Sequence, residues 1–188
     1  MITGINEKIK RLRLARGLTL QKLSELSGFS KGYLSRIEAS RTAPRLPTLQ
    51  RIARVFDTDV SEFFEQPDHS GKKRQDIDLV TRRSENHTQT IESNADYSYQ
   101  PLVHSYRGKY MAPYLLRIAK GHTQKFTHDS EEFIYVISGS IGFGFEGAHY
   151  SLQEGDSAYF DSRKEHQVFN ESKSEAVLLN VVFDYKRF

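Results

Sequence analysis

The stretch LTLQKLSELSGFSKGYLSRIE, residues 18–38, predicts two short amphipathic helices joined by a turn at Gly28. Apolar residues recur at the spacing of one helix face in each half: Leu20, Leu23 and Leu26 in the first, and Leu34 and Ile37 in the second. Thr19 and Ser30 precede the two helices, where a hydroxyl accepts a hydrogen bond from an otherwise unpaired N–H of the first turn. Gly28 tolerates a positive φ, which lets the first helix end and the chain turn sharply.

The second helix projects polar side chains away from its apolar face. They are Lys31, Tyr33, Ser35 and Arg36. A helix that presents basic and hydrogen-bonding groups in this way fits the major groove of double-stranded DNA. We therefore expect this helix to bind DNA.

Residues 5–65 resemble the helix-turn-helix domain of the phage-repressor (Cro/XRE) family. Beside the two-helix stretch, the resemblance is carried by a first helix with inward Ile5, Ile9 and Leu12, by SKGYLSRIE at 30–38, by PRLPTLQRIA at 44–53 and by DVSEFF at 59–64. It implies a bundle of five helices, in which residues 31–39 form the recognition helix.

The same resemblance implies roles for single residues. Lys31 and Arg36 would read bases, and Ser30, Tyr33 and Arg41 would hold phosphates. Gly32 stands where other members carry a base-reading side chain, so discrimination there must come from neighbours or from DNA shape. The expected DNA-binding set is Thr19, Ser30, Lys31, Tyr33, Ser35, Arg36 and Arg41.

Other interpretations remain open for these charged residues. Arg36 could pair with Glu25 or Glu38 instead of touching DNA. Glu38 is expected to make an internal ion pair or hydrogen bond, because phosphates repel a carboxylate. A five-helix bundle without a DNA role is the remaining alternative.

The charge of the chain is divided unevenly. Residues 1–66 hold 12 Lys and Arg against 7 Asp and Glu, whereas residues 67–188 hold 15 against 17. The basic excess thus lies on the helical part, where attraction to phosphates needs it. We expect a helix-turn-helix domain at 1–66, a polar linker at 67–94 and a second domain at 95–188.

The location of the protein can be inferred from what the sequence lacks. No stretch approaches the roughly 20 apolar residues of a membrane span, and the first residues carry no secretory apolar run. We expect a cytoplasmic protein that does not enter a membrane. The chain has no cysteine, so a metal site would need imidazole and carboxylate ligands.

Short β-rich runs separated by Gly, Asp and Ser follow residue 95. Strands are expected at 114–119, 133–138, 141–145, 158–160 and 176–183. Residues 95–185 resemble the cupin family through GHTQKFTHDSEEFIYVISG at 121–139 and GDSAYFDSRKEHQVFN at 155–170. The resemblance implies an all-β jelly-roll barrel, so the fold class is a multidomain α and β chain.

Metal-binding cupins hold their ion with two histidines and a glutamate from the first motif and one histidine from the second. The matching positions here are Phe126, His128, Glu132 and His166, so one expected ligand is an apolar ring. The three remaining residues can form a facial triad, and the resemblance implies Fe, Zn, Ni or Mn as candidate ions. The alternative is a metal-free polar interior whose groups hold an organic ligand directly.

Five tyrosines lie between residues 97 and 114, and such rings suit either a β core, a dimer contact or a pocket wall. We single out Tyr99, His104 and Arg117 as pocket candidates, with Arg117 a possible partner of an anionic ligand. The expected effector-binding set is Tyr99, His104, Arg117, Phe126, His128, Glu132 and His166.

These resemblances together imply a transcriptional regulator. It would bind a DNA operator as a homodimer paired through the β domain, and an effector in the cupin domain would change operator affinity. The alternative is an enzyme, a mononuclear iron oxygenase similar to hydroxypropylphosphonate epoxidase, which joins the same two domains. A lysine of that enzyme's helical domain reaches its substrate, and Gly17 stands in the matching region here.

Overall fold

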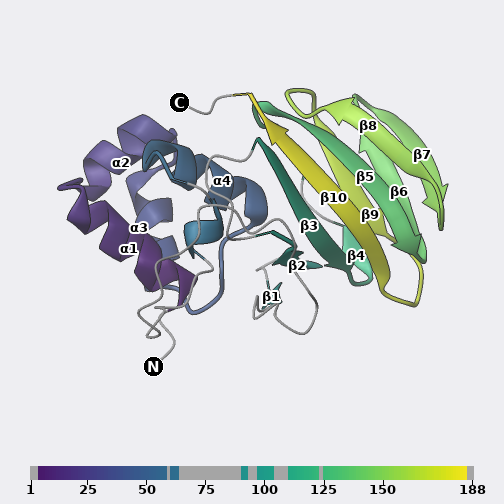
Figure 1. Cartoon of the computed structure of the whole chain (residues 1–188), viewed down its shortest axis with the longest axis horizontal. Helices are drawn as coiled ribbons and strands as arrows, with labels where there is room; N and C mark the ends of the chain where they lie inside the picture. Colours follow the sequence, from purple (N-terminus) through teal and green to yellow (C-terminus); the bar gives the residue numbers. More distant parts are fainter. Residues whose placement is uncertain are drawn as a thin grey trace.

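The computed structural model describes residues 4–58, 60–63, 90–92, 97–103, 110–122 and 125–185. Helices gather at one end of the molecule and two β-sheets at the other (Figure 1). The predicted order along the chain, a helical region followed by a β domain, is therefore confirmed. Most of the expected linker at 67–94 and the candidate residue His104 lie outside the described residues.

Local signals set the boundaries of the helices, which are α1 (Ile5–Ala15), α2 (Leu20–Ser27), α3 (Lys31–Ala39) and α4 (Leu46–Val55). Both predicted N-caps are present: Thr19 Oγ1 accepts from the Lys22 N–H at 3.0 Å, and Ser30 Oγ accepts from the Tyr33 N–H at 3.2 Å. Gly28 ends α2 with a φ of 69°. Within the described part of the chain, no helix is long and apolar enough to cross a membrane.

The prediction of a fifth α-helix is wrong. The described residues of that segment form a single 3₁₀ turn, Val60–Phe63. In 3₁₀ geometry residues i and i+3 lie on the same side, and both Val60 and Phe63 are buried. The short turn thus anchors two apolar side chains in the helical core without a further helix.

One expected core position on α2 also differs. Leu26 is 52% exposed, whereas Leu23 is fully buried. The buried face of α2 runs through Leu23 and Ser27, which leaves Leu26 at the edge of that face. Its side chain instead lines a cleft that faces the β domain.

A buried ion pair joins α1 to α3. Arg13 donates from Nε and Nη2 to the two carboxylate oxygens of Glu38, at 2.6 and 2.9 Å. Arg13 Nη1 also donates to the Leu18 carbonyl at 2.8 Å. The expectation that Glu38 has an internal partner is therefore confirmed.

The second domain is all-β, as predicted. Its strands are β1 (Ile91–Glu92), β2 (Tyr97–Pro101), β3 (Met111–Ile118), β4 (Gly121–His122), β5 (Ser130–Ser138), β6 (Ser140–Phe145), β7 (Ala148–Gln153), β8 (Ser157–Asp161), β9 (His166–Asn170) and β10 (Ala176–Asp184). They form a six-stranded sheet in the order β1-β2-β3-β10-β5-β8 and a four-stranded sheet in the order β4-β9-β6-β7. Side chains from the facing sides of the two sheets make the core of the domain.

The expected closed barrel is not formed by the described residues, because their two sheets remain separate. The edge strand β4 has only two residues, and a single bridge between Phe126 and His166 continues beside β9. So short an edge offers too few backbone pairs to close the domain. The result is an open sandwich with a space between its sheets.

Helix α4 lies on the side of the helical domain that faces the sheets (Figure 1). At its start, the Leu46 N–H donates to the Tyr97 hydroxyl at 3.3 Å. The Tyr99 hydroxyl donates to the Pro44 carbonyl at 3.0 Å. Two tyrosines of β2 therefore hold the start of α4 and the segment just before it.

The far end of α4 is fastened by Arg54. Its Nε donates to Asp184 Oδ2 at 2.8 Å, and its Nη2 donates to the Asp129 carbonyl, also at 2.8 Å. Asp184 ends β10, and Asp129 precedes β5. The helical domain is thus joined to the β domain at both ends of one helix.

Candidate functional site

A cavity of about 50 Å³ lies between α4 and the inner faces of the sheets. Much of its wall is apolar, and three residues of α4 complete it: Leu46, Pro47 and Gln50. The polar residues that the β domain contributes are Tyr97, His128, Glu132, His166 and Asn180. The cavity therefore belongs to both domains.

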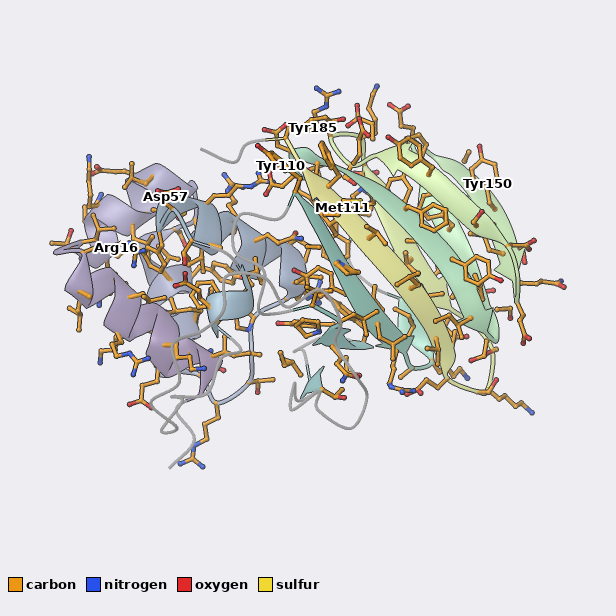
Figure 2. All side chains as sticks on the ribbon, in the orientation of Figure 1. Arg16, Asp57, Tyr110, Met111, Tyr150 and Tyr185 are labelled. Carbon is orange, nitrogen blue, oxygen red and sulfur yellow. The ribbon has the colours of Figure 1, made fainter. Side chains whose placement is uncertain are left out.

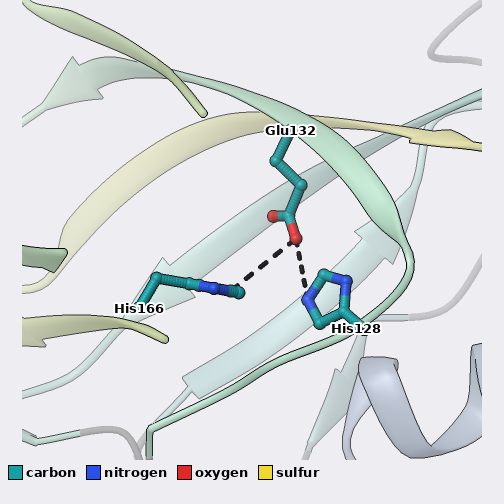
Figure 3. Close-up of side chains that lie close together, drawn as sticks. All are labelled: His128, Glu132 and His166. Atoms are coloured by element: carbon teal, nitrogen blue, oxygen red, sulfur yellow. Dashed lines mark ion pairs between the residues drawn. The ribbon is translucent and has the colours of Figure 1, made fainter. Parts of the chain in front are cut away.

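Glu132 is the centre of the polar group (Figure 3). Its Oε1 lies 2.9 Å from His128 Nε2 and 3.8 Å from His166 Nε2. Ser162 Oγ donates to Oε1 at 3.0 Å, and Asn180 Nδ2 donates to Oε2 at 2.9 Å. The strands explain the convergence, because inward positions of β5, β9 and β10 supply Glu132, His166 and Asn180.

The environment favours a charged glutamate beside a neutral histidine. Burial alone would raise the pKa of Glu132, but the hydrogen bond from His128 and the nearby imidazoles hold it below its ordinary value. Burial lowers the pKa of His166, against the opposing effect of Glu132. The cavity therefore contains a charged carboxylate, that of Glu132, and a neutral imidazole, that of His166.

The hydrogen bonds of His166 decide which of its nitrogens is available. Its Nδ1 lies 2.9 Å from the Lys164 carbonyl, which can only accept. Nδ1 therefore carries the proton, and the lone pair of Nε2 faces Glu132. Such a second contact is the usual way in which a histidine ligand is oriented.

The residues present fit a divalent cation. Ligand atoms of His128, Glu132 and His166 all lie within 4.8 Å of one another. In addition, Asn180 Oδ1 is buried without a hydrogen-bond partner among the described residues. Two imidazoles and one carboxylate on one side of a cavity match the facial triad that leaves further positions open.

Comparison with known proteins identifies both halves of the chain. Residues 9–63 match the helix-turn-helix family model, and residues 114–182 match the cupin domain model. The chain is a helix-turn-helix protein with a C-terminal cupin domain. The matches agree with the two resemblances found in the sequence.

Relatives match this chain along most of their length. The chain is 26% identical over 169 residues to the HTH-type transcriptional regulator PuuR of Escherichia coli, covering 88% of this chain and 87% of the relative. The crystal structure of an HTH_3 family transcriptional regulator from Vibrio cholerae matches with a TM-score of 0.68 at 22% identity, over 98% of this chain and 97% of the other. Hydroxypropylphosphonic acid epoxidase from S. wedmorenis matches with a TM-score of 0.50 at 21% identity, over 96% and 97%. The two structural likenesses show a shared fold.

The helix-turn-helix domain presents α3 to solvent. Lys31, Ser35 and Arg36 are exposed on it, and Arg41 is exposed just beyond its end. Gly32 is open as well, since a Cβ added there would meet no atom within 4 Å. Thr19 and Ser30 are exposed caps, placed at the starts of α2 and α3.

Tyr33 lies differently from its neighbours on α3. It is half-buried, with its ring 5.3 Å from that of Phe29 and its hydroxyl 3.3 Å from Thr48 Oγ1. The ring therefore supports the helix, and only its exposed edge can reach a phosphate.

The alternative partners of Arg36 are engaged elsewhere. Glu38 pairs with Arg13, and Glu25 pairs with Lys22 at 3.2 Å. Within the described part of the chain no ion pair of Arg36 is found. Its guanidinium is thus free to meet an external acceptor.

The cupin domain brings together four of the seven expected effector residues. Phe126, His128, Glu132 and His166 all line the cavity. Tyr99 does not line it, because the ring is fully buried and its hydroxyl bonds to the helix-turn-helix domain. Arg117 does not line it either, since it lies on the outer face of β3 and pairs with Glu175 at 3.2 Å.

Sequence reasoning missed three polar residues of the cavity wall. Tyr97 lines it where Tyr99 was expected; the two tyrosines share one face of β2, and Tyr97 is the one that lies beside Leu46 of α4, which also lines the cavity. Asn180 had a visible signal, as the one polar residue within the apolar run AVLLNVVF at 176–183. Gln50 had none, because only the packing of α4 on the cupin domain brings it there.

Proposed function

We propose that this chain is a sequence-specific DNA-binding transcriptional regulator, and that a small molecule bound in the cupin cavity modulates its affinity for an operator. The observation that supports this most is the presence, in one chain, of an exposed basic helix and a buried cavity that holds a polar cluster and whose wall includes α4. A ligand can shift DNA affinity only if it binds two arrangements of the protein unequally. Because residues of both domains line the cavity, a change in their arrangement would alter the contacts of a bound ligand.

We assign base reading to Lys31 and Arg36. Both are exposed on α3, and an arginine fits the two acceptors on the major-groove edge of guanine. The helix would be positioned on the DNA backbone by Ser30 and Arg41, together with Thr19, Ser35 and the exposed edge of Tyr33. Such phosphate contacts fix the register without reading sequence.

The cavity is proposed to hold a divalent metal, Fe, Zn, Ni or Mn, as part of the effector site. His128, Glu132 and His166 would be its ligands, with Phe126 in place of a fourth. Such an ion supplies open coordination positions that an anionic or neutral effector can occupy. Metal analysis of the purified protein tests this assignment, and Glu132→Gln should lose the ion.

A homodimer is proposed to form through the outer face of the six-stranded sheet. Residues 176–183 of β10 are almost wholly apolar, yet only alternate positions face the core. A strand that is apolar on both faces is typical of a sheet covered on both sides. Exposed Tyr135 and Ile137 on β5 extend the same surface, and Tyr110, Met111 and Tyr185 gather at one end of the sheet (Figure 2). Two α3 helices would then reach successive major grooves.

The test of sequence-specific binding compares two arginine variants. A duplex is first selected from random DNA with the wild-type chain, and its affinity is then compared with that of random duplex. Arg36→Ala should lose about tenfold of the preference for the selected duplex, because one bidentate base contact is worth about 1–3 kcal/mol. Arg41→Ala should weaken both duplexes about equally and reduce the salt dependence by about one unit of slope.

Retention of full preference by a folded Arg36→Ala protein would count against the assignment of α3. Failure of the wild-type chain to enrich any sequence would count against the function itself. Circular dichroism of both variants establishes that they remain folded.

An iron-dependent oxygenase is the second candidate. It is favoured by the fold shared with the epoxidase and by the triad of His128, Glu132 and His166. The wall that α4 contributes to the cavity holds Leu46, Pro47 and Gln50, and no lysine. Oxygen uptake by the iron-loaded protein would support this candidate, and a regulator needs none.

A further inference from the structure

Arg54 on α4 connects the two domains at a point next to the cavity. Its side chain is 26% exposed, and its guanidinium donates in two directions, to the carboxylate of Asp184 and to the backbone carbonyl of Asp129. The carboxylate lies at the end of β10 and the carbonyl lies just before β5. One helix-turn-helix side chain thus holds two separate segments of the cupin domain.

The carbonyl that Arg54 holds belongs to the residue that follows His128. The segment is a tight turn, in which the Ser130 N–H donates to the His128 carbonyl at 2.9 Å. Ser130 Oγ lies 2.7 Å from His128 Nδ1, so the ring is fixed to the same turn. A change in the position of the His128 ring therefore acts on the turn that carries the acceptor of Arg54.

Binding of a cation would change the His128 ring directly. In the structure Nε2 of His128 is hydrogen bonded to Glu132 at 2.9 Å. One nitrogen cannot donate a proton to a carboxylate and also offer its lone pair to a cation. An ion at the cluster must therefore replace that hydrogen bond, and the proton must leave Nε2.

A wide cleft gives access to this region. It has a volume of about 790 Å³ and is lined by α2, α4 and residues 125–129. Pro47, Gln50, Phe126 and His128 line both the cleft and the cavity. An ion can therefore enter from solvent along the face of α4 that carries Arg54.

We infer that Arg54 is the residue through which a divalent cation at His128, Glu132 and His166 acts on the DNA-binding domain. With an ion bound, the His128 ring would be held in place, the turn at 128–130 would move with the ring, and Arg54 would transmit the change to α4 because it is bonded to that turn. This inference rests on the proposed role of the cupin domain as an effector site. It names α4 as the helix that responds when the cation site is occupied, and Arg54 as the side chain that links α4 to that site.

The test measures amide hydrogen exchange in the full chain with and without Zn²⁺. Bound ligand slows exchange throughout a folded protein, so α1 serves as the internal reference for α4. In the wild-type chain, Zn²⁺ should slow the hydrogen exchange of the amides of residues 46–55 several-fold more than that of the amides of α1. Glu132→Gln, which removes the carboxylate ligand, should abolish the effect.

Two arginines of α4 provide matched variants. Arg54→Gln should still bind Zn²⁺ in calorimetry within a few-fold of the wild type, yet its α4 and α1 amides should respond equally. Arg51→Gln is the control, because Arg51 is exposed and its guanidinium lies 4.9 Å from the Phe29 ring of its own domain. It should respond as the wild type does. Asp184→Asn loosens the same link from the cupin side and should resemble Arg54→Gln.

A second measurement separates this inference from the proposed function. DNA affinity with and without Zn²⁺ should differ at least about fivefold in the wild type and in Arg51→Gln, and should hardly differ in Arg54→Gln. A Zn²⁺ effect on α4 without any effect on DNA affinity would overturn the proposed regulation and leave the coupling intact.

Three results would overturn the inference. They are a wild-type chain that does not bind Zn²⁺, one that binds it without a selective change in α4, and an Arg54→Gln chain that responds like the wild type. The first result would leave an organic effector as the occupant of the cavity.

Discussion

The ion pair between Arg13 and Glu38 shows how one carboxylate can be kept away from a DNA surface. Both side chains are less than 10% exposed, and two hydrogen bonds join them. Removal of one partner from such a pair leaves the other charge buried and uncompensated. Glu38 thus fixes the start of the bundle to α3 and does not repel phosphates.

Glu38→Gln should therefore lower the free energy of unfolding by about 3 kcal/mol. Glu25→Gln is the control, because Glu25 and its partner Lys22 are both more than half exposed and their pair is screened by water. Urea unfolding followed by circular dichroism measures both. An unchanged midpoint for Glu38→Gln would show that the pair is not a structural link.

At the scale of single residues, the centre of the cavity was predictable and its rim was not. The resemblance of two motifs to those of metal-binding cupins was enough to predict that His128, Glu132 and His166 meet. Tyr97 was missed because Tyr97 and Tyr99 share one face of β2, and only the position of α4 decides which of the two reaches the cavity.

Among the elements, β6 shows how a strand makes room for its neighbour. Gly142 lies opposite Phe169 of β9, and a Cβ at Gly142 would come within 2.0 Å of the ring of Phe169. Glycine therefore lets an aromatic side chain lie across the strand. Gly144, two residues on, has its nearest neighbour 3.7 Å from the added Cβ.

Gly142→Ala should destabilise the cupin domain by about 1–3 kcal/mol, because the ring of Phe169 must move in a packed sheet. Gly144→Ala makes the same chemical change in the same strand, where the added methyl group fits. Thermal unfolding of the two variants gives the comparison. Equal melting temperatures would show that the sheet adjusts at no cost.

The helices and strands were largely predictable, because caps and periodicity are local signals. Thr19, Ser30 and Gly28 act where the sequence places them. The predictions of a fifth α-helix and of a closed barrel were wrong. Both features depend on how many backbone hydrogen bonds the surrounding structure allows, and no local pattern gives that number.

Contacts between the domains decide how the whole molecule is arranged. Tyr97, Tyr99 and Arg54 bond to groups that lie 51, 55 and 130 residues away in the sequence. No local pattern encodes such contacts, so the role of α4 as a wall of the cavity was invisible before the fold was known.

The outer face of the six-stranded sheet gives a prediction for the assembly. Tyr135→Glu places a charge in the proposed dimer surface and should convert a dimer to a monomer in light scattering. Tyr150→Glu is the control, since Tyr150 is exposed on β7 of the other sheet (Figure 2). A monomeric wild type, or a dimeric Tyr135→Glu protein, would show that this surface does not join two copies.

Footprinting of the wild-type chain on its selected duplex shows whether two recognition helices of one dimer read an operator. We expect two protected half-sites whose centres are about 10 base pairs apart, on one face of the duplex. Protection of a single half-site, or protection that is the same on random DNA, would contradict it.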